Sequence, residues 1–350
     1  MHLKNIHKSF KLEGKSFENE KDLLSFSKTN HSIIYPFLCE WFDKLKYVTV
    51  STSGSTGKPK RIKLKKEFMI NSAKATGTFF NLSACTTALL CLPVQFIAGK
   101  MMLVRALILG WEIDVIEPNS NPLMHVKKKY DFSAMVPLQL YNSLDNLSKI
   151  KILIVGGGVV SSKLQLKTID LPTKIYATYG MTETITHIAI KPINKASGLS
   201  IKNDIYQTLP DVNIRKDNRD CLVIYAPNIS DEIIVTNDII DLLSENSFKW
   251  LGRFDNIINS GGIKLIPEQI EKKLSAVIDC RFFVFGVTDE TLSEKLVLLV
   301  EGASFKFDNK SIKNILTKFE IPKAVYFVDS FVVTKTGKID RKSTKKMIIE

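Results

Sequence analysis

Short β-type runs alternate with helical segments between residues 47 and 180, and this alternation constrains the fold more than any other feature of the chain. Hydrophobic runs of strand length occupy residues 47–51, 88–93, 112–117, 132–137, 151–156 and 174–180. The segments between them are long enough for helices, for example 65–78 and 100–109. Strand–helix alternation of this kind predicts an α/β domain with a mainly parallel sheet.

The pattern changes after about residue 205, where turn-rich segments take over and a β-hairpin is expected around Lys216–Asp220. A short mixed module follows, with helices expected at 267–278 and 310–319 and strands at 281–287, 295–301 and 324–328. A chain of 350 residues has room for two domains. We therefore predict a large N-terminal α/β domain over residues 1–253 and a small C-terminal α+β domain over residues 254–350, joined by a hinge.

The charge of the chain bears on its partners. The formal net charge is +13, yet 42 of the 49 basic residues are Lys, and they lie scattered along the chain. Recognition of phosphate or guanine in a fork geometry favours Arg. The pattern therefore indicates a solvated basic surface that helps to collect small anions, and we expect no nucleic-acid partner.

Neither the hydrophobic runs nor the cysteines indicate a membrane or secreted protein. No stretch approaches the ~20 apolar residues of a membrane span, and the first residues have no apolar core for a signal peptide. The five cysteines are dispersed and form no CxxC, which is typical of reduced thiols. We expect a cytoplasmic protein without a membrane span; the sequence does not predict its oligomeric state.

The most informative segment follows the first expected strand directly and reads Thr52-Ser53-Gly54-Ser55-Thr56-Gly57-Lys58-Pro59-Lys60. Its glycines let the backbone approach a ligand closely, and its hydroxyls and successive N–H groups can surround phosphate oxygens. Lys58 and Lys60 can neutralise the charge. The segment is not a Walker A loop, because only two residues separate its glycines and Pro59 follows Lys58. It predicts a phosphate-binding loop of another kind.

This loop resembles the phosphate loop of the adenylate-forming superfamily, which includes acyl-CoA synthetases, adenylation domains of peptide synthetases and luciferases. The segment ATYGMTET, residues 177–184, resembles the superfamily's Tyr-Gly-x-Thr-Glu element. The resemblance implies that Tyr179 stacks near adenine, that Thr182 contacts the α-phosphate and that Glu183 holds Mg²⁺, a hard cation that suits a carboxylate. Taken alone, the segment is more typical of a helix N-cap, with Thr182 or Thr184 as the capping residue.

The segments TND, residues 236–238, and WLGRFD, residues 250–255, resemble the ribose-binding and hinge region of the same superfamily. The resemblance implies that Asp238 accepts hydrogen bonds from both ribose hydroxyls, that Arg253 donates to the ribose and that Asp255 is the hinge. Asn237 stands where the superfamily usually has Gly. We expect this difference to be tolerated, because Asn adopts a positive φ more readily than most residues.

Two segments of the small module complete the resemblance. In SGGIKL, residues 260–265, Gly262 would lie where the pantetheine arm of CoA passes; taken alone, the glycine pair predicts a hairpin turn. In TKTGKIDR, residues 334–341, Lys338 would enter the site during adenylation and bridge the substrate carboxylate and the α-phosphate. A point cation on a flexible stem suits a group that must enter and leave.

The phosphate loop begins near residue 52, so the resemblance leads us to expect a chain that is short for the superfamily, without most of the usual N-terminal subdomain. Compact versions of this kind resemble the o-succinylbenzoate–CoA ligases of menaquinone synthesis, and residues 92–107 resemble the entry to their substrate-side helix. The implied substrates are a carboxylic acid, ATP with Mg²⁺, and CoA. The implied reaction forms an acyl-adenylate and then a thioester, with hinge rotation between the two halves.

o-Succinylbenzoate carries a second carboxylate that does not react, and this group must be met by a cation, hydroxyls, N–H groups or water. The candidates are Gln95 (where many relatives have His), Lys100, Arg105 and the backbone of Gly156, Gly157 and Gly158. Lys100 and Arg105 are equally compatible with structural roles. The glycine run does not fit a dinucleotide loop, because the third glycine of GxGxxG would fall at Ser161. His187 and the other histidines show no metal-ligand spacing, and we interpret His187 as a packed or surface residue instead of a catalyst.

Three alternatives remain open from the sequence. The chain could activate another aryl or fatty acid, or load a carrier protein instead of CoA. It could be a nucleotide-binding regulator that keeps the fold without turnover. The third, a basic nucleic-acid binder, is disfavoured because no basic stripe is interleaved with aromatic residues.

Overall fold

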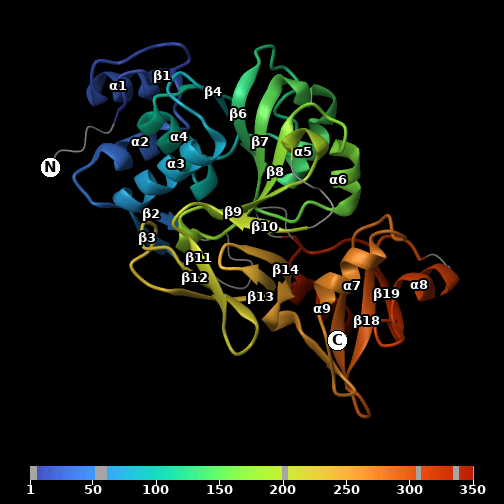
Figure 1. Ribbon diagram of the computed structural model, residues 1–350. Coiled ribbons are helices and arrows are strands. Elements are labelled where there is room, and N and C mark those ends of the chain that lie inside the picture. Colours follow the sequence, from blue (N-terminus) through green and yellow to red (C-terminus); the bar gives the residue numbers. More distant parts are fainter. Residues whose placement is uncertain (1–5, 52–60, 199–203, 305–308, 334–338, 350) are drawn as a thin grey trace.

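The computed structural model describes residues 6–51, 61–198, 204–304, 309–333 and 339–349 (Figure 1). Its largest element is a twelve-stranded sheet in the order β1-β5-β4-β6-β7-β8-β9-β10-β14-β13-β12-β11. A separate five-stranded sheet lies in the C-terminal part of the chain, and β2 and β3 form a two-stranded sheet of their own.

The first six strands of the large sheet are parallel to one another. They are β1 (Lys11–Leu12), β4 (Thr87–Leu90), β5 (Glu112–Val115), β6 (Tyr130–Met135), β7 (Ile150–Val155) and β8 (Lys174–Gly180). The helices between these strands are α3 (Lys66–Phe80), α4 (Ile97–Leu109), α5 (Pro137–Asn142) and α6 (Ser162–Thr168), with a 3₁₀ turn at Leu144–Lys149. The predicted α/β class is confirmed.

The sheet continues beyond β8 with antiparallel strands, which the sequence indicated only in part. They are β9 (His187–Pro192), β10 (Tyr206–Thr208), β11 (Asn213–Lys216), β12 (Cys221–Tyr225), β13 (Ile234–Ser244) and β14 (Ser247–Arg253). The hairpin expected around Lys216–Asp220 is confirmed by β11 and β12. The sheet is therefore mixed, with its parallel part limited to the strands before β9.

Alternate residues of the parallel strands enter two separate apolar clusters. Ile152 and Ile154 of β7 belong to one cluster, whereas Leu153 and Val155 belong to the other. Successive side chains of a strand point to opposite faces, so both faces of the sheet are covered, as parallel strands require. Helix α4 is buried along almost its whole length, which explains its continuous apolar sequence.

The N-terminal part differs from expectation at residues 47–51. This run forms β2 (Tyr47–Ser51), but its partner is the antiparallel β3 (Arg61–Lys65) rather than a strand of the large sheet. The helices α1 (Glu20–Asn30) and α2 (Tyr35–Phe42) precede it, and Asn19 caps α1 by accepting hydrogen bonds from two backbone N–H groups. Loop 52–60 thus connects two strands whose ends pair at Ser51 and Arg61.

The second sheet begins after residue 257 (Figure 1). Its strands are β15 (Ile258–Ser260), β16 (Ile263–Leu265), β17 (Phe282–Asp289), β18 (Ser293–Glu301) and β19 (Ala324–Val328). The accompanying helices are α7 (Pro267–Leu274), α8 (Asn309–Ile315) and α9 (Arg341–Ile349). The expected elements are present, although α7 and α8 end earlier than predicted. No helix in the described part of the chain has both the length and the apolar character that crossing a bilayer requires.

Candidate functional site

The carboxyl ends of the parallel strands carry several of the predicted site residues. Strand β7 leads directly into Gly156–Gly158, and β8 ends next to the segment with Thr182. Open α/β sheets bind ligands at this edge. A Cβ atom at Gly156 would lie 2.5 Å from the Thr178 hydroxyl, so a larger residue at this position would displace the Thr178 side chain. Gly157, with a φ of 75°, and Gly158 are exposed.

Three residues predicted to contact the nucleoside meet at one carboxylate. Asp238 of β13 is buried, and its Oδ2 accepts a hydrogen bond from the Tyr179 hydroxyl at 2.6 Å. Its Oδ1 accepts from Trp250 Nε1 at 3.2 Å and lies 3.5 Å from Arg253 Nη1. A carboxylate has about four acceptor positions, so Asp238 keeps capacity for a further donor. Burial, followed by the Asp238 charge, raises the pKa of Tyr179 well above its ordinary value.

Aromatic residues surround the Tyr179 ring. It makes edge contacts with Phe248 at a centroid distance of 5.2 Å and with Tyr206 at 5.9 Å. Because Tyr179 lies on β8, Tyr206 on β10 and Phe248 on β14, the antiparallel half of the sheet brings this group together. The TND and WLGRFD segments indicated Asp238 and Arg253, but Trp250 as a direct partner of Asp238 was not predicted.

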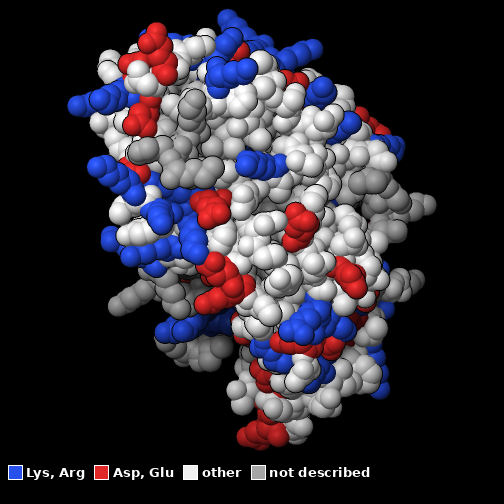
Figure 2. Space-filling view, turned by 60° about the vertical axis from the view of Figure 1, so that its left-hand side comes forward, with Lys and Arg blue, Asp and Glu red and all other residues white. Residues whose placement is uncertain are grey.

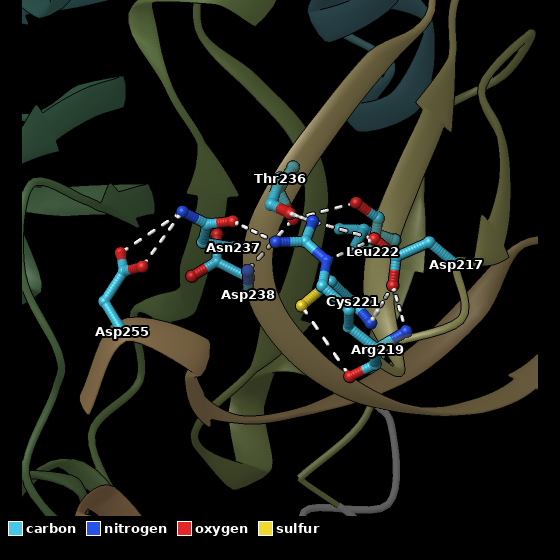
Figure 3. Close-up of polar contacts among 8 residues, drawn as sticks. All are labelled: Asp217, Arg219, Cys221, Leu222, Thr236, Asn237, Asp238 and Asp255. Atoms are coloured by element: carbon cyan, nitrogen blue, oxygen red, sulfur yellow. Dashed lines mark hydrogen bonds and ion pairs between the residues drawn. The ribbon is translucent and has the colours of Figure 1, made fainter. Parts of the chain in front are cut away.

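The hinge candidate Asp255 is connected to the same region through Asn237 (Figure 3). Asn237 Nδ2 donates to both carboxylate oxygens of Asp255, at 3.1 and 3.3 Å. Asn237 lies inside strand β13 and does not have a positive φ. Our reason for its tolerance was therefore wrong: no left-handed conformation is needed here, and Asn is accommodated because its side chain has partners.

Thr182 and Glu183 lie in a single 3₁₀ turn that follows β8. The Thr184 hydroxyl fixes this turn by accepting from Met181 N at 2.9 Å and donating to the Thr186 carbonyl at 2.7 Å. Ile185 then adopts a φ of 64°, which reverses the chain into β9. The N-cap position of this turn is Met181, so neither Thr182 nor Thr184 is a helix N-cap, although the Thr184 side chain bonds the backbone at that position.

Glu183 is exposed, and its carboxylate has no hydrogen-bond or ion-pair partner among the described residues. Over that same part of the chain, no group of three or more His, Cys, Asp or Glu residues could hold a metal ion. A free single carboxylate fits Mg²⁺, which typically takes one or two protein carboxylates together with phosphate oxygens and water. The donor set therefore fits the predicted ion only when a phosphate ligand is bound.

Arg105 is a buried cation without a carboxylate partner in the described structure. Its side chain is 1% exposed; Nε donates to the Thr76 hydroxyl at 3.2 Å and Nη2 to the Thr186 hydroxyl at 3.4 Å. Burial lowers its pKa to about 9, which leaves it cationic at neutral pH. The buried His187 lies next to it through Thr186, and burial followed by the Arg105 charge lowers the pKa of His187 well below its ordinary value.

The other two side chains proposed for the second carboxylate are placed differently. Lys100 is buried but forms an ion pair with Glu40 at 2.8 Å, and its ammonium lies 4.8 Å from the centre of the Phe37 ring. Gln95 is exposed just before α4. The structure thus gives Lys100 a carboxylate partner inside the protein, whereas the partners of Arg105 among the described residues are two hydroxyls and the Met102 sulfur.

Two glycines form the tip of the β15–β16 hairpin, as the hairpin alternative predicted. Gly261 and Gly262 have φ values of 56° and 80°, which suit a two-residue turn of the primed type. Loop residues Thr52–Lys60 and Lys338 lie outside the described residues. The chain is described again at Ile339, which forms an isolated bridge with Val333.

The chain is similar in sequence and in fold to known enzymes. Residues 47–215 match the family model of AMP-binding enzymes. The chain is 36% identical to a solved acyl-CoA synthetase (AMP-forming)/AMP-acid ligase II-like protein from Dyadobacter fermentans, with 90% of this chain and 93% of that chain covered and a TM-score of 0.60. This chain therefore belongs to the AMP-binding enzyme family, the adenylate-forming class that its site residues indicated.

Within this class, the chain is similar to two further proteins. A 2-succinylbenzoate–CoA ligase from Staphylococcus epidermidis is 26% identical, with 95% of this chain and 76% of the relative covered. The solved o-succinylbenzoate coenzyme A synthetase from Bacillus subtilis, in complex with ATP and magnesium, is 20% identical, with 85% of this chain and 69% of that chain covered and a TM-score of 0.71. The second likeness concerns the fold.

Proposed function

We propose that this protein is an AMP-forming acid–CoA ligase whose acid is o-succinylbenzoate. The observation that carries the choice of acid is Arg105, a fully buried guanidinium with two hydroxyl partners and no carboxylate in the described structure. Leaving a buried charge unpaired is costly, and a ligand carboxylate would pair it. The similarity to 2-succinylbenzoate–CoA ligases supports the same acid.

The first half-reaction joins the succinyl carboxylate to the α-phosphate of ATP and releases pyrophosphate. Tyr179, Asp238 and Arg253 would bind adenine and ribose, and Thr182 would donate to the α-phosphate. Glu183 would hold Mg²⁺, which neutralises phosphate charge when bound. Negative charge develops on oxygen in this step, so fixed donors and cations are the main catalytic resource. Loop Thr52–Lys60 and Lys338 would supply further cations.

The second half-reaction forms the thioester as the CoA sulfur attacks the adenylate carbonyl and AMP leaves. In our proposal residues 254–350 are a small mobile domain that turns about Asp255, removing Lys338 and bringing Gly262 to the pantetheine arm. The location of β15–β16 immediately after Asp255 is compatible with this assignment, because a rotation about Asp255 changes the orientation of the hairpin relative to the large sheet.

A panel of acids tests the function directly. Pyrophosphate release is measured with o-succinylbenzoate and with 4-oxo-4-phenylbutanoate, which lacks the aromatic carboxylate; benzoate and a medium-chain fatty acid serve as further acids. We expect o-succinylbenzoate to give the highest kcat/KM, and thioester to form only when CoA is added. Equal turnover of the first two acids would contradict the proposed acid, and adenylate formation without transfer to CoA would indicate a carrier-loading enzyme.

A further inference from the structure

Asp255 is held from two directions where the chain passes from the large sheet to the second sheet. Arg253 Nη2 donates to its Oδ2 at 3.1 Å, while Asn237 Nδ2 reaches both of its oxygens. Arg253 ends strand β14 and also contacts Asp238 of β13. Asn237 belongs to β13 as well, so both contacts tie Asp255 to the large sheet, and the Asn237 contact reaches Asp255 from the strand next to its own chain segment.

The orientation of the Asn237 amide is set by Arg219 (Figure 3). Arg219 Nη1 donates to Asn237 Oδ1 at 2.9 Å, and Nη2 donates to the Thr236 carbonyl at 3.1 Å. A guanidinium can only donate hydrogen bonds. The amide oxygen of Asn237 must therefore face Arg219, which turns the amide nitrogen toward Asp255.

Arg219 is itself fixed at the turn between β11 and β12. Its Nε and Nη2 both donate to Asp217 Oδ2, at 2.9 and 2.8 Å. The other oxygen of Asp217 accepts from the backbone N–H groups of Arg219 and Cys221, and the guanidinium lies 5.1 Å from the centre of the Phe254 ring. A guanidinium that contacts a carboxylate on one side and an aromatic ring on the other has little rotational freedom.

We propose that Asn237, oriented by Arg219, is a positioning residue that clasps Asp255 and holds residues 254–350 in the orientation seen here. This inference rests on the proposed function, because it takes Asp255 as the pivot between the two half-reactions. Glycine, the usual residue of the superfamily at this position, has no side-chain amide with which to make the contact. The clasp would therefore shift the equilibrium between the two orientations of residues 254–350, one for each half-reaction, toward the orientation seen here.

The ion pairs of Asp204 allow the orientation of residues 254–350 to be measured without an assay of activity. Asp204 forms ion pairs with Lys191 of β9 and with Lys272 of α7. The Lys191 pair lies within the large sheet region, whereas the Lys272 pair spans the boundary at residue 254. Zero-length carbodiimide cross-linking at Asp204, analysed by peptide mass spectrometry, therefore yields one cross-link that depends on orientation and one internal reference.

The test compares the wild-type chain with Asn237→Ala, Arg219→Gln and the control Asn246→Gly. Asn246 lies in the turn between β13 and β14, where its side chain contacts Ser244. For Asn237→Ala we expect the ratio of Lys272 to Lys191 cross-links to fall about threefold. We expect the ratio of the two half-reaction rates to change about fivefold. Both values correspond to the loss of hydrogen bonds to a carboxylate. Arg219→Gln should act in the same direction, and Asn246→Gly should match the wild type.

The half-reactions are measured separately, as pyrophosphate exchange and as thioester formation from preformed acyl-adenylate. A cross-link ratio in Asn237→Ala equal to that of the wild type would overturn the clasp, whatever the rates. If Asn237→Ala unfolds, Arg219→Gln decides by the same ratio. A wild-type chain with neither half-reaction would contradict the proposed function alone, because the cross-link ratio still tests whether Asn237 holds the orientation.

Discussion

Two buried cations on the same helix have opposite surroundings. Lys100 and Arg105 both lie on α4, and both are less than a tenth exposed. Lys100 meets Glu40 at 2.8 Å, and Glu40 also accepts from the backbone of Thr49, so the pair connects α4 to α2 and β2. Arg105 has hydroxyl partners but no carboxylate among the described residues.

The presence or absence of a carboxylate partner distinguishes a charge that stabilises the fold from one that a ligand carboxylate could pair. The free energy of burying Lys100 is offset inside the protein, and removal of either partner would leave the other without compensation. The free energy of burying Arg105 is not offset in the same way, so the ligand-free protein carries a cost that a bound anion would relieve. Stability should therefore respond to changes at Lys100, and substrate choice to changes at Arg105.

The largest expected effect is on substrate choice. Arg105→Met should lower kcat/KM for o-succinylbenzoate about 100-fold, as loss of one partner of a buried charge pair predicts. For 4-oxo-4-phenylbutanoate the change should be within about threefold, because that acid has no aromatic carboxylate. Steady-state pyrophosphate release with both acids gives the two ratios. An equal loss for both acids would mean that Arg105 serves the fold or the nucleotide instead of the second carboxylate.

The same variant should not lose stability. Replacing an unpaired buried charge by an apolar side chain of similar length is neutral or stabilising. Lys100→Met should instead lower the free energy of unfolding by about 2 kcal/mol, less than for a fully enclosed pair because Glu40 is partly exposed. Urea denaturation of both variants measures this, and the double variant Glu40→Met/Lys100→Met should recover part of the loss. If Lys100→Met also reversed the preference between the two acids, the contrast between the cations would fail.

Much of the nucleotide region could be predicted from sequence. The strand with Tyr179 was predicted with the bounds observed, and the segments with Asp238 and Arg253 do converge. Local patterns sufficed to find the motifs because each is a short contiguous segment, and the antiparallel strands β13 and β14 pair at Asp238 and Arg253. The antiparallel half of the sheet was harder to predict, since its strands are separated by turns and their pairing order is not encoded in period-2 alternation.

The surroundings of the two cations could not be predicted. Lys100 and Glu40 are 60 residues apart, and nothing in either local segment indicates their pairing. The contact between Arg105 and Thr186 joins residues 81 apart. Asn237 was noted only as a departure from the family pattern, since its role depends on Arg219 in another hairpin. His187 was interpreted as a packed or surface residue, and its burial beside Arg105 became visible only in the structure.

The smallest expected effect concerns His187, the neighbour of Arg105. Its pKa in the folded protein lies well below the ordinary value, through burial and then the Arg105 charge. The unfolded chain therefore takes up a proton more readily than the folded protein as the pH falls below about 6.5. Stability is full above that pH and declines below it, by at most about 2 kcal/mol at pH 5, the limit set by a histidine of ordinary pKa in the unfolded chain. His187→Gln cannot be protonated, so it should lose less stability than the wild type between pH 7 and 5 in urea denaturation. Identical pH dependence of the two proteins would show that the pKa of His187 is not lowered in the folded protein.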